Sequence, residues 1–595
     1  MSEEQSRPVS RRRWIGIAGL PAIAAAAEFA LESSQAAADD AKGKVDLSKS
    51  DGGDMAGCRV FNIRQFGAKG DGKTLDTSAV QAAIDACTAD RGGIVLVPAG
   101  TFLIAPIQLK SNVTLHIVAD GTLLGSTDPA LYQPAEGIPI SGDHTMGDGN
   151  VGLIHANNAE NITIEGAGAI DGQGKDLRAN GLNGIRRCHL SLFYKCKHLT
   201  IRDVYMYQSS YHTCRIANSS FINIDGLRIF SRVTGNNDGF HFISSEYVTI
   251  NNCIVRSQDD ACALFGSCKY IMVTNSFFST RWSVFRFGGG EAGNVVVSNC
   301  VMDQVFGCPI KLHCDPGSRF ENMSFSNIMM KDVTGPISIG AGPARLGGGM
   351  GAVAATADSK SSDSKSADSK IADSKSGDGA TPIDQRPPAT VRNISFSNIS
   401  GTVITKETKL GDTTFTGANR PGEQHSCIQL NCVEGHTIEN ISLSDIRLTF
   451  DGGGTAEHAA QRDLAQTAGE YFALGPMPAY GLWARNVRGL SLSNVRFQLA
   501  APDLRPAVIF DKVQDATLMN LSADGDAQAE SLLRLMNSAD TLITAPRVLS
   551  STPVFLRVEG ADNRNIIVDG GDLTKADKSL VTVDGAKADA VKIRA

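Results

Sequence analysis

Acidic side chains gather in two short segments of the chain. An Asn-Asn-Asp-Gly segment contains Asp238, and a Ser-Gln-Asp-Asp segment ends in Asp259 and Asp260. Carboxyl groups that lie close together raise the pKa of at least one member, which leaves a protonated acid beside ionised bases. Such a set can protonate a leaving group and activate a water molecule. The residue types therefore predict acid–base catalysis.

The interval between the two segments favours this role over a structural one. Asn and Asp also cap turns between strands, and Asn-Asp-Gly alone would favour that reading. Asp238 and Asp259, however, are 21 residues apart, slightly less than one repeat of the surrounding sequence. Equivalent positions of stacked strands lie about 4.8 Å apart. With a lateral offset, the carboxyl groups approach the roughly 6.5–9.5 Å that admits a water molecule in inverting glycoside hydrolysis.

The repeat is a short sequence pattern, here called the repeated phrase. The strands that it forms must position these residues. A polar or aromatic residue is followed by three or four alternating β-formers and then by Asn or Asp. The phrase begins at Asn161, His198, Phe221, Tyr247, Tyr270, Asn294, Asn322, Asn393, Asn440, Gly489 and Asp515. From Phe221 to Asn322 the steps are 26, 23, 24 and 28 residues. This period predicts an all-β fold, a single right-handed parallel β-helix, whereas the motif of a leucine-rich horseshoe is missing.

The predicted β-helix is one domain, residues 58–595, with one interruption. The apolar pattern of residues 77–87 predicts a helix that caps the open N-terminal end of the solenoid. Between Asp358 and Lys375 the triplet Asp-Ser-Lys occurs four times. Such a polar, small-residue segment cannot bury a core, so we expect residues 346–390 to be a disordered insert within the domain.

The N-terminus predicts export. Arg11 and Arg12 precede an apolar run that extends to about Ala27, which is typical of a twin-arginine signal. We therefore interpret residues 1–50 as an export signal and linker that direct the protein to the periplasm or the extracellular space. No later segment offers 18 uninterrupted apolar residues, so no membrane span is expected after signal cleavage.

Composition narrows the classes of partner. The formal net charge is −7, and no dense run of basic residues follows the signal, so we expect no nucleic-acid partner. The 13 cysteines show no Cys-x-x-Cys spacing. Most are interpreted as buried small apolar residues, with one or two disulfides left open. We expect no metal site, no cofactor and a monomer whose partner is a polysaccharide or oligosaccharide.

The sequence also contains a match to a nucleotide-binding motif, which we interpret as a coincidence of local composition. Residues 67–74, Gly-Ala-Lys-Gly-Asp-Gly-Lys-Thr, match the phosphate-binding loop of nucleotide hydrolases. That motif requires a helix that opens directly at its Lys-Thr pair. Here the predicted helix begins only after Asp76, the better N-cap. The context therefore argues against an ATPase.

Four segments resemble a known family. They are Gly67–Thr77, Ala83–Asp85, Gly92–Thr101 and Gly168–Gly174. Together with the two acidic segments they resemble the polygalacturonase and rhamnogalacturonase type of glycoside hydrolase (family 28), within the pectate-lyase-like β-helix superfamily. The resemblance is clear over about residues 58–330 and looser over 390–530. It implies that Asp259 is the general acid and that Asp238 and Asp260 activate water for inversion.

Three departures from the family pattern concern the substrate. No histidine lies near Thr280-Arg-Trp282, where the family has Gly-His-Gly, and the family's Arg-Ile-Lys appears as Pro309-Ile-Lys311. His241 stands where many members have Asp. We interpret Lys311, Arg281 and His241 as substrate-binding residues. The pattern predicts a uronate-containing or decorated pectic chain, such as rhamnogalacturonan, in preference to smooth polygalacturonate.

Two other functions remain open on sequence grounds. A polysaccharide lyase on the same fold would use calcium and a basic residue to abstract a proton beside a uronate. A non-catalytic carbohydrate-binding β-helix would bind glycan and release nothing. Product chemistry separates these classes from a hydrolase.

Overall fold

The structure, a computed structural model, describes residues 54–55, 58–139, 149–344, 385–406, 408, 410 and 422–594. Residues Asp54–Ala595 form one compact unit. The predicted export segment, residues 1–50, lies outside the described residues, as do residues 346–384 of the predicted insert.

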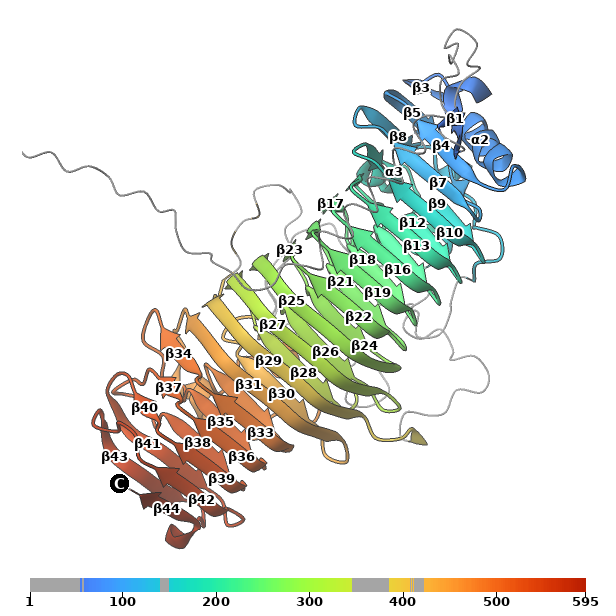
Figure 1. Ribbon diagram of the computed structural model, residues 1–595. Coiled ribbons are helices and arrows are strands. Elements are labelled where there is room, and N and C mark those ends of the chain that lie inside the picture. Colours follow the sequence, from blue (N-terminus) through green and yellow to red (C-terminus); the bar gives the residue numbers. More distant parts are fainter. Residues whose placement is uncertain are drawn as a thin grey trace, which may run out of the picture. The chain divides into compact units, whose positions relative to one another are not determined.

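The compact unit is a stack of coils whose strands form two sheets (Figure 1). Sheet I has 29 strands: β1 (Asp54–Met55), β2 (Cys58–Asn62), β3 (Asp71–Leu75), β4 (Gly93–Val97), β5 (Gly100–Ile104), β7 (Val113–Ile117), β8 (Gly121–Gly125), β10 (Glu160–Glu165), β11 (Ala169–Asp171), β13 (Lys197–Arg202), β14 (Tyr205–Tyr207), β16 (Ser220–Asp225), β17 (Arg228–Ser231), β19 (Glu246–Asn251), β20 (Ile254–Ser257), β22 (Lys269–Thr274), β23 (Phe277–Thr280), β25 (Glu291–Val305), β27 (Arg319–Val333), β29 (Thr390–Val403), β31 (Thr437–Phe450), β33 (Val487–Ser493), β34 (Arg496–Leu499), β36 (Gln514–Met519), β37 (Ser522–Ala523), β39 (Ala539–Thr544), β40 (Arg547–Val548), β42 (Arg564–Asp569) and β44 (Val591–Arg594).

Sheet II has 15 strands, and each of its described neighbours pairs in parallel. They are β6 (Ile107–Gln108), β9 (Val151–Asn157), β12 (Cys188–Tyr194), β15 (Cys214–Ala217), β18 (Phe240–Ile243), β21 (Cys262–Phe265), β24 (Phe285–Gly288), β26 (Ile310–Cys314), β28 (Ile337–Ala341), β30 (Ile428–Cys432), β32 (Leu482–Arg485), β35 (Val508–Asp511), β38 (Leu533–Met536), β41 (Thr552–Glu559) and β43 (Ala576–Val583). The described helices are few: α2 (Thr77–Ala89), α3 (Gly174–Ala179) and α4 (Ala456–Ala460), with short 3-10 turns at η2 (Ile63–Phe66), η3 (Pro129–Leu131), η4 (Gly184–Arg186) and η8 (Ala588–Ala590).

The two sheets differ in what covers their outer faces. Strands of sheet I alternate buried and more exposed residues, as in β7 and β8, which is typical of a sheet with one solvated face. In contrast, every residue of β26, β28 and β30 is buried. Part of the cover is the segment between β31 and β32, residues 451–481, here called the covering segment. Its Thr467 carbonyl accepts a hydrogen bond from Asn431 Nδ2 at 2.7 Å.

Asparagine side chains lock the register between successive coils. Asn275, Asn299, Asn327 and Asn398 all have φ between 50° and 56°, a left-handed conformation that Asn tolerates better than most residues. Each donates its Nδ2 hydrogen to the asparagine Oδ1 one coil earlier, at 2.7–3.3 Å. This asparagine ladder explains why Asn recurs in the repeated phrase.

The nucleotide-binding motif is a structural turn. Its Lys73 and Thr74 lie in β3 rather than at the start of a helix. The N–H groups of Lys69 and Gly70 both donate to the Asp76 carboxylate, at 2.7 and 2.9 Å. Because backbone donors of the loop are bound to a carboxylate of this chain, the loop does not form a phosphate cradle.

The predicted N-terminal helix forms as α2, and its Val80, Ala83, Ile84 and Cys87 join the core at the first coils. Its role as a cap for the open end stays a prediction. No helix in the described ranges is long and apolar enough to cross a membrane. The twelve cysteines whose side chains are described are all buried, and no disulfide joins any two of them.

The burial of Phe325 predicts a large loss of stability when its aromatic ring is removed. Phe325 on β27 is fully buried and stacks on Phe396 at a centroid distance of 5.2 Å. We expect Phe325→Ala to lower the free energy of unfolding by about 3–5 kcal/mol because it leaves a cavity. Met329, on the same strand, is 49% exposed, so Met329→Ala should change it by less than about 0.5 kcal/mol. Denaturant unfolding measures both, and equal effects would contradict the burial pattern.

Candidate active site

The three predicted carboxyl residues meet at the start of two neighbouring strands of sheet II. Phe240 of β18 pairs with Cys262 of β21, and the Gly239 N–H donates to the Asp260 carbonyl at 2.9 Å. This register places Asp238 and Asp260 at equivalent positions of adjacent coils. Asp259 lies one residue earlier, out of register, which accounts for the offset that the 21-residue interval predicted.

Asp259 is the carboxyl group that stays protonated. Burial raises its pKa to about 8, and the nearby charges of Asp238 and Asp260 add to the shift. Its Oδ2 accepts a hydrogen bond from Asn236 Nδ2 at 3.1 Å, and its Oδ1 accepts one from the Asp260 N–H at 2.9 Å. At neutral pH this group carries a proton that it can donate.

Asp238 is held by a histidine pair. The group is 4% exposed, and its Oδ2 lies 2.7 Å from His241 Nδ1 and 3.9 Å from His212 Nε2. Since an ionised carboxylate only accepts hydrogen bonds, His241 Nδ1 donates here. The His212 ring stacks on His241 at 3.9 Å, and burial holds the pKa of His212 well below its usual value. His212 is therefore neutral, and His241 lies against a predicted catalytic carboxylate.

The same three side chains are also close enough to bind a metal ion. Ligand atoms of His212, Asp238 and His241 all lie within 4.8 Å of one another, the one such group of three or more within the described part of the chain. The hydrogen bond between His241 and Asp238, however, already uses the two atoms that would bind an ion. We assign the group to orienting Asp238.

Asp260 is fixed by a cation that the sequence motifs did not reveal. Its Oδ1 accepts a hydrogen bond from the Ser283 N–H at 3.2 Å, and its Oδ2 lies 3.5 Å from Arg286 Nη1. Arg286 belongs to β24, the next strand of sheet II. It sits in no recognised motif, so only the strand register places it beside the acidic segments.

These groups line a pocket of about 300 Å³. Its aromatic walls are Tyr211, Phe265 and Trp282, which suit the apolar faces of a sugar ring. The complete lining is Tyr211, His212, Gly235, Asn236, Asp238, His241, Gln258, Asp259, Asp260, Phe265, Trp282 and Arg286.

The two cations that were predicted to contact substrate, Arg281 and Lys311, each pair with a carboxylate of this chain. Arg281 is 2% exposed, and its guanidinium donates to Glu423 Oε2 and to the Phe306 carbonyl, both at 3.1 Å. Lys311 is fully buried, and its Nζ lies 2.8 Å from Glu470 Oε2. Neither residue is among those that line the pocket. Their predicted role as direct contacts to substrate stays a prediction that this geometry does not favour.

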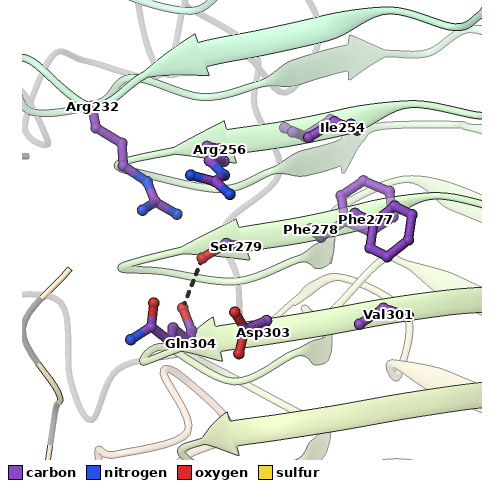
Figure 2. Close-up of a pocket in the computed structure, with 10 residues that line it drawn as sticks. Arg232, Ile254, Arg256, Phe277, Phe278, Ser279, Val301, Asp303 and Gln304 are labelled. Atoms are coloured by element: carbon purple, nitrogen blue, oxygen red, sulfur yellow. Dashed lines mark hydrogen bonds between the residues drawn. The ribbon is translucent and has the colours of Figure 1, made fainter. Parts of the chain in front are cut away.

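A second hollow, of about 410 Å³, lies on β20, β23 and β25 of sheet I. Figure 2 shows Arg232, which directly follows β17, Arg256 toward the end of β20, and Phe277 farther along the hollow. Its lining contains one carboxyl group, Asp303, which lies 3.6 Å from Lys331 Nζ. A single ion-paired carboxylate does not provide both an acid and a base, so the smaller pocket is the candidate active site.

The raised pKa of Asp259 predicts a titration near neutrality. Infrared difference spectra between wild type and Asp259→Asn should show a protonated carboxyl band that disappears with a midpoint of about pH 8. Asp238→Asn should lower that midpoint because it removes a repelling charge. Asp303→Asn should leave it unchanged. A midpoint near the ordinary value of 3.8 would contradict the assignment.

The same shift has a consequence for stability. Because the folded-state pKa is raised, the contribution of Asp259 to stability is complete below about pH 4 and is lost as pH rises to about 8. Asp259→Asn removes this dependence on pH. The unfolding midpoint of the variant should therefore rise relative to that of wild type as pH increases from about 4 to about 8.

Comparisons with known proteins point to one family and one fold. Residues 87–342 match the family model described as glycosyl hydrolases family 28. An exo-poly-alpha-D-galacturonosidase of Dickeya chrysanthemi is 33% identical over 256 residues, which cover 39% of this chain and 42% of that protein. The match thus spans less than half of that relative. An exopolygalacturonase of Oenothera organensis is 26% identical over 391 residues, with 62% of this chain and 88% of the relative covered.

One solved structure shows the fold. The family 28 exopolygalacturonase of Yersinia enterocolitica superposes with a TM-score of 0.52 at 18% identity and covers 78% of each chain. The parallel strands of this chain and that likeness confirm the predicted right-handed parallel β-helix. The family resemblance that the motifs predicted is likewise confirmed: residues 87–342 are a segment of the glycosyl hydrolases family 28 type.

Proposed function

We propose that this protein is an exported glycoside hydrolase that cleaves a pectin-type, uronate-containing polysaccharide with inversion at the anomeric carbon. The proposal rests on the different environments of the three carboxyl groups in the pocket. Asp259 holds a proton, while Asp238 and Asp260 are fixed by His241 and Arg286. The family match and the relatives named for galacturonan hydrolysis support it. Export rests on the arginine pair and the apolar run of the first 27 residues.

Each carboxyl group has one task in the reaction. Asp259 donates its proton to the glycosidic oxygen, which leaves with the electron pair of the broken C–O bond. A water molecule held by Asp238 and Asp260 attacks the anomeric carbon from the opposite face and gives up a proton to these carboxylates. The product keeps the new hydroxyl group, and exchange with solvent restores the protons. Contacts with His241 and Arg286 hold the two bases in place before attack.

The substrate follows from the charges available at the pocket. Arg286 is the one cationic side chain among its lining residues, and the aromatic walls provide sugar-stacking surfaces. The chain lacks the arginine of the family's Arg-Ile-Lys, since Pro309 stands there. We therefore infer a mixed chain of uronate and other sugars, such as rhamnogalacturonan, rather than smooth polygalacturonate.

Carboxylate substitutions test the mechanism. We expect Asp259→Asn and Asp238→Asn each to lower kcat by about 10²–10⁴-fold with little change in folding, since general acid–base groups contribute about that much. The kcat/KM of wild type should fall on the alkaline side with a midpoint of about pH 8, because Asp259 then loses its proton. Asp303→Asn, at the other hollow, is the matched control. Near-normal turnover by either active-site variant refutes the assignment.

Product analysis tests the reaction class and the substrate. On a panel of rhamnogalacturonan, polygalacturonate and neutral glycans, we expect reducing ends to appear fastest from rhamnogalacturonan, without ultraviolet-absorbing products. Proton NMR of the first product should show the anomer opposite to that of the bond cleaved. Unsaturated products that vanish with chelator would establish a lyase instead. Binding without release of any product, unaffected by Asp259→Asn, would establish a carbohydrate-binding protein.

A further inference from the structure

Glu470 of the covering segment bridges two cations, one of which, Arg286, lines the pocket. Its Oε1 lies 2.9 Å from Arg286 Nη2, and its Oε2 lies 2.8 Å from Lys311 Nζ. Arg286 of β24 and Lys311 of β26 are register partners on adjacent strands. One carboxylate therefore uses both of its oxygens to span two coils.

This ion pair lies next to the catalytic carboxyl groups. Arg286 also contacts Asp260, and it lines the pocket together with Trp282. The ammonium group of Lys311 lies 5.2 Å from the centre of the Trp282 ring. Along sheet II, β18, β21, β24 and β26 succeed one another. A polysaccharide that follows these coils past Asp238 and Asp260 must place a neighbouring sugar beside Arg286, the member of the cation pair that lines the pocket.

Glu470 is built into this position. The next residue, Tyr471, is 2% exposed, and its hydroxyl group lies 3.2 Å from Thr334 Oγ1 and 3.3 Å from the Phe306 carbonyl. Phe472 packs edge-on against Trp282 at 6.0 Å. Anchors directly after Glu470 hold its backbone, so the carboxylate stays in contact with Arg286, which lines the pocket.

Glu470 is ionised at neutral pH. Arg286 first, then Lys311, holds the pKa of Glu470 well below its usual value, and Glu470 in turn contributes to a raised pKa of Arg286. A substrate carboxylate that approached Arg286 and Lys311 would meet a carboxylate already bound between them. Displacing it would leave Glu470 unpaired near a buried site, which is costly.

We propose that Glu470 is a specificity-determining residue that neutralises Arg286 and Lys311 in place of a substrate carboxylate, so that the sugar bound beside Arg286 is uncharged. The inference rests on the proposed function and deepens it. A chain in which uronates alternate with neutral sugars fits such a site, because one sugar carries the charge and its neighbour does not. Each contiguous pair of uronates is disfavoured by the resident carboxylate.

The test is Glu470→Gln, which keeps the shape of the side chain and removes its charge. We expect the ratio of kcat/KM for polygalacturonate to kcat/KM for rhamnogalacturonan to rise at least tenfold, because the positive charges of Arg286 and Lys311 are then no longer neutralised by a carboxylate of this chain. Glu423→Gln removes a carboxylate that pairs with Arg281 outside the pocket lining, and it should keep the wild-type ratio. The double variant with Lys311→Met should lose the gain. A folded Glu470→Gln protein with the wild-type ratio overturns the inference.

A binding experiment distinguishes a failure of this inference from a failure of the proposed function. Digalacturonate and neutral galactobiose are titrated into Asp259→Asn protein with and without Glu470→Gln, by calorimetry. We expect Glu470→Gln to tighten digalacturonate binding about tenfold and to leave galactobiose binding unchanged. This result supports the role of Glu470 even if no glycan is hydrolysed, in which case only the proposed function fails. Equal binding of digalacturonate by both proteins, at unchanged melting temperature, refutes the inference.

Discussion

The backbone ladder between successive strands of sheet II sets every distance in the candidate site. Phe240 pairs with Cys262, Cys262 with Phe285, and Phe285 with Ile310. Side chains on these strands are therefore placed at steps of about 4.8 Å, and residues far apart in sequence become neighbours along one line. The acid, the two bases and the cation Arg286 take their positions from this ladder, whereas Glu470 reaches Arg286 from the covering segment.

Charge balance follows from that crowding. Two buried or half-buried cations, Arg286 and Lys311, lie beside the acidic cluster, and an isolated charge in such a setting would be costly. Glu470 and Asp260 share Arg286 between them. This arrangement lets Asp260 stay beside Asp259 while the charges of Asp238 and Asp260 still help to raise the pKa of Asp259. The proton on one carboxyl group thus depends on how the others are paired.

The sequence predicted those features that depend on local spacing. The phrase repeated every 23–28 residues predicted the coils because strand alternation and asparagine turns are local. Asp238, Asp259 and Asp260 were found because they lie within one coil of each other. Glu470 and Glu423 were missed because their partners, Lys311 and Arg281, lie 159 and 142 residues away. For the same reason Arg281 was predicted to face substrate, although its partner is a buried carboxylate from a distant segment.

The asparagine ladder separates the parts of the chain that can change length from the parts that cannot. Its first three steps span 24, 24 and 28 residues, whereas the step from Asn327 to Asn398 spans 71 and closes with a 2.7 Å hydrogen bond. A coil thus tolerates dozens of added residues provided that they leave and return at the same corner. The covering segment, residues 451–481, likewise leaves the stack after β31 and returns at β32, so its length and sequence can change without altering the spacing of the three candidate catalytic carboxyl groups.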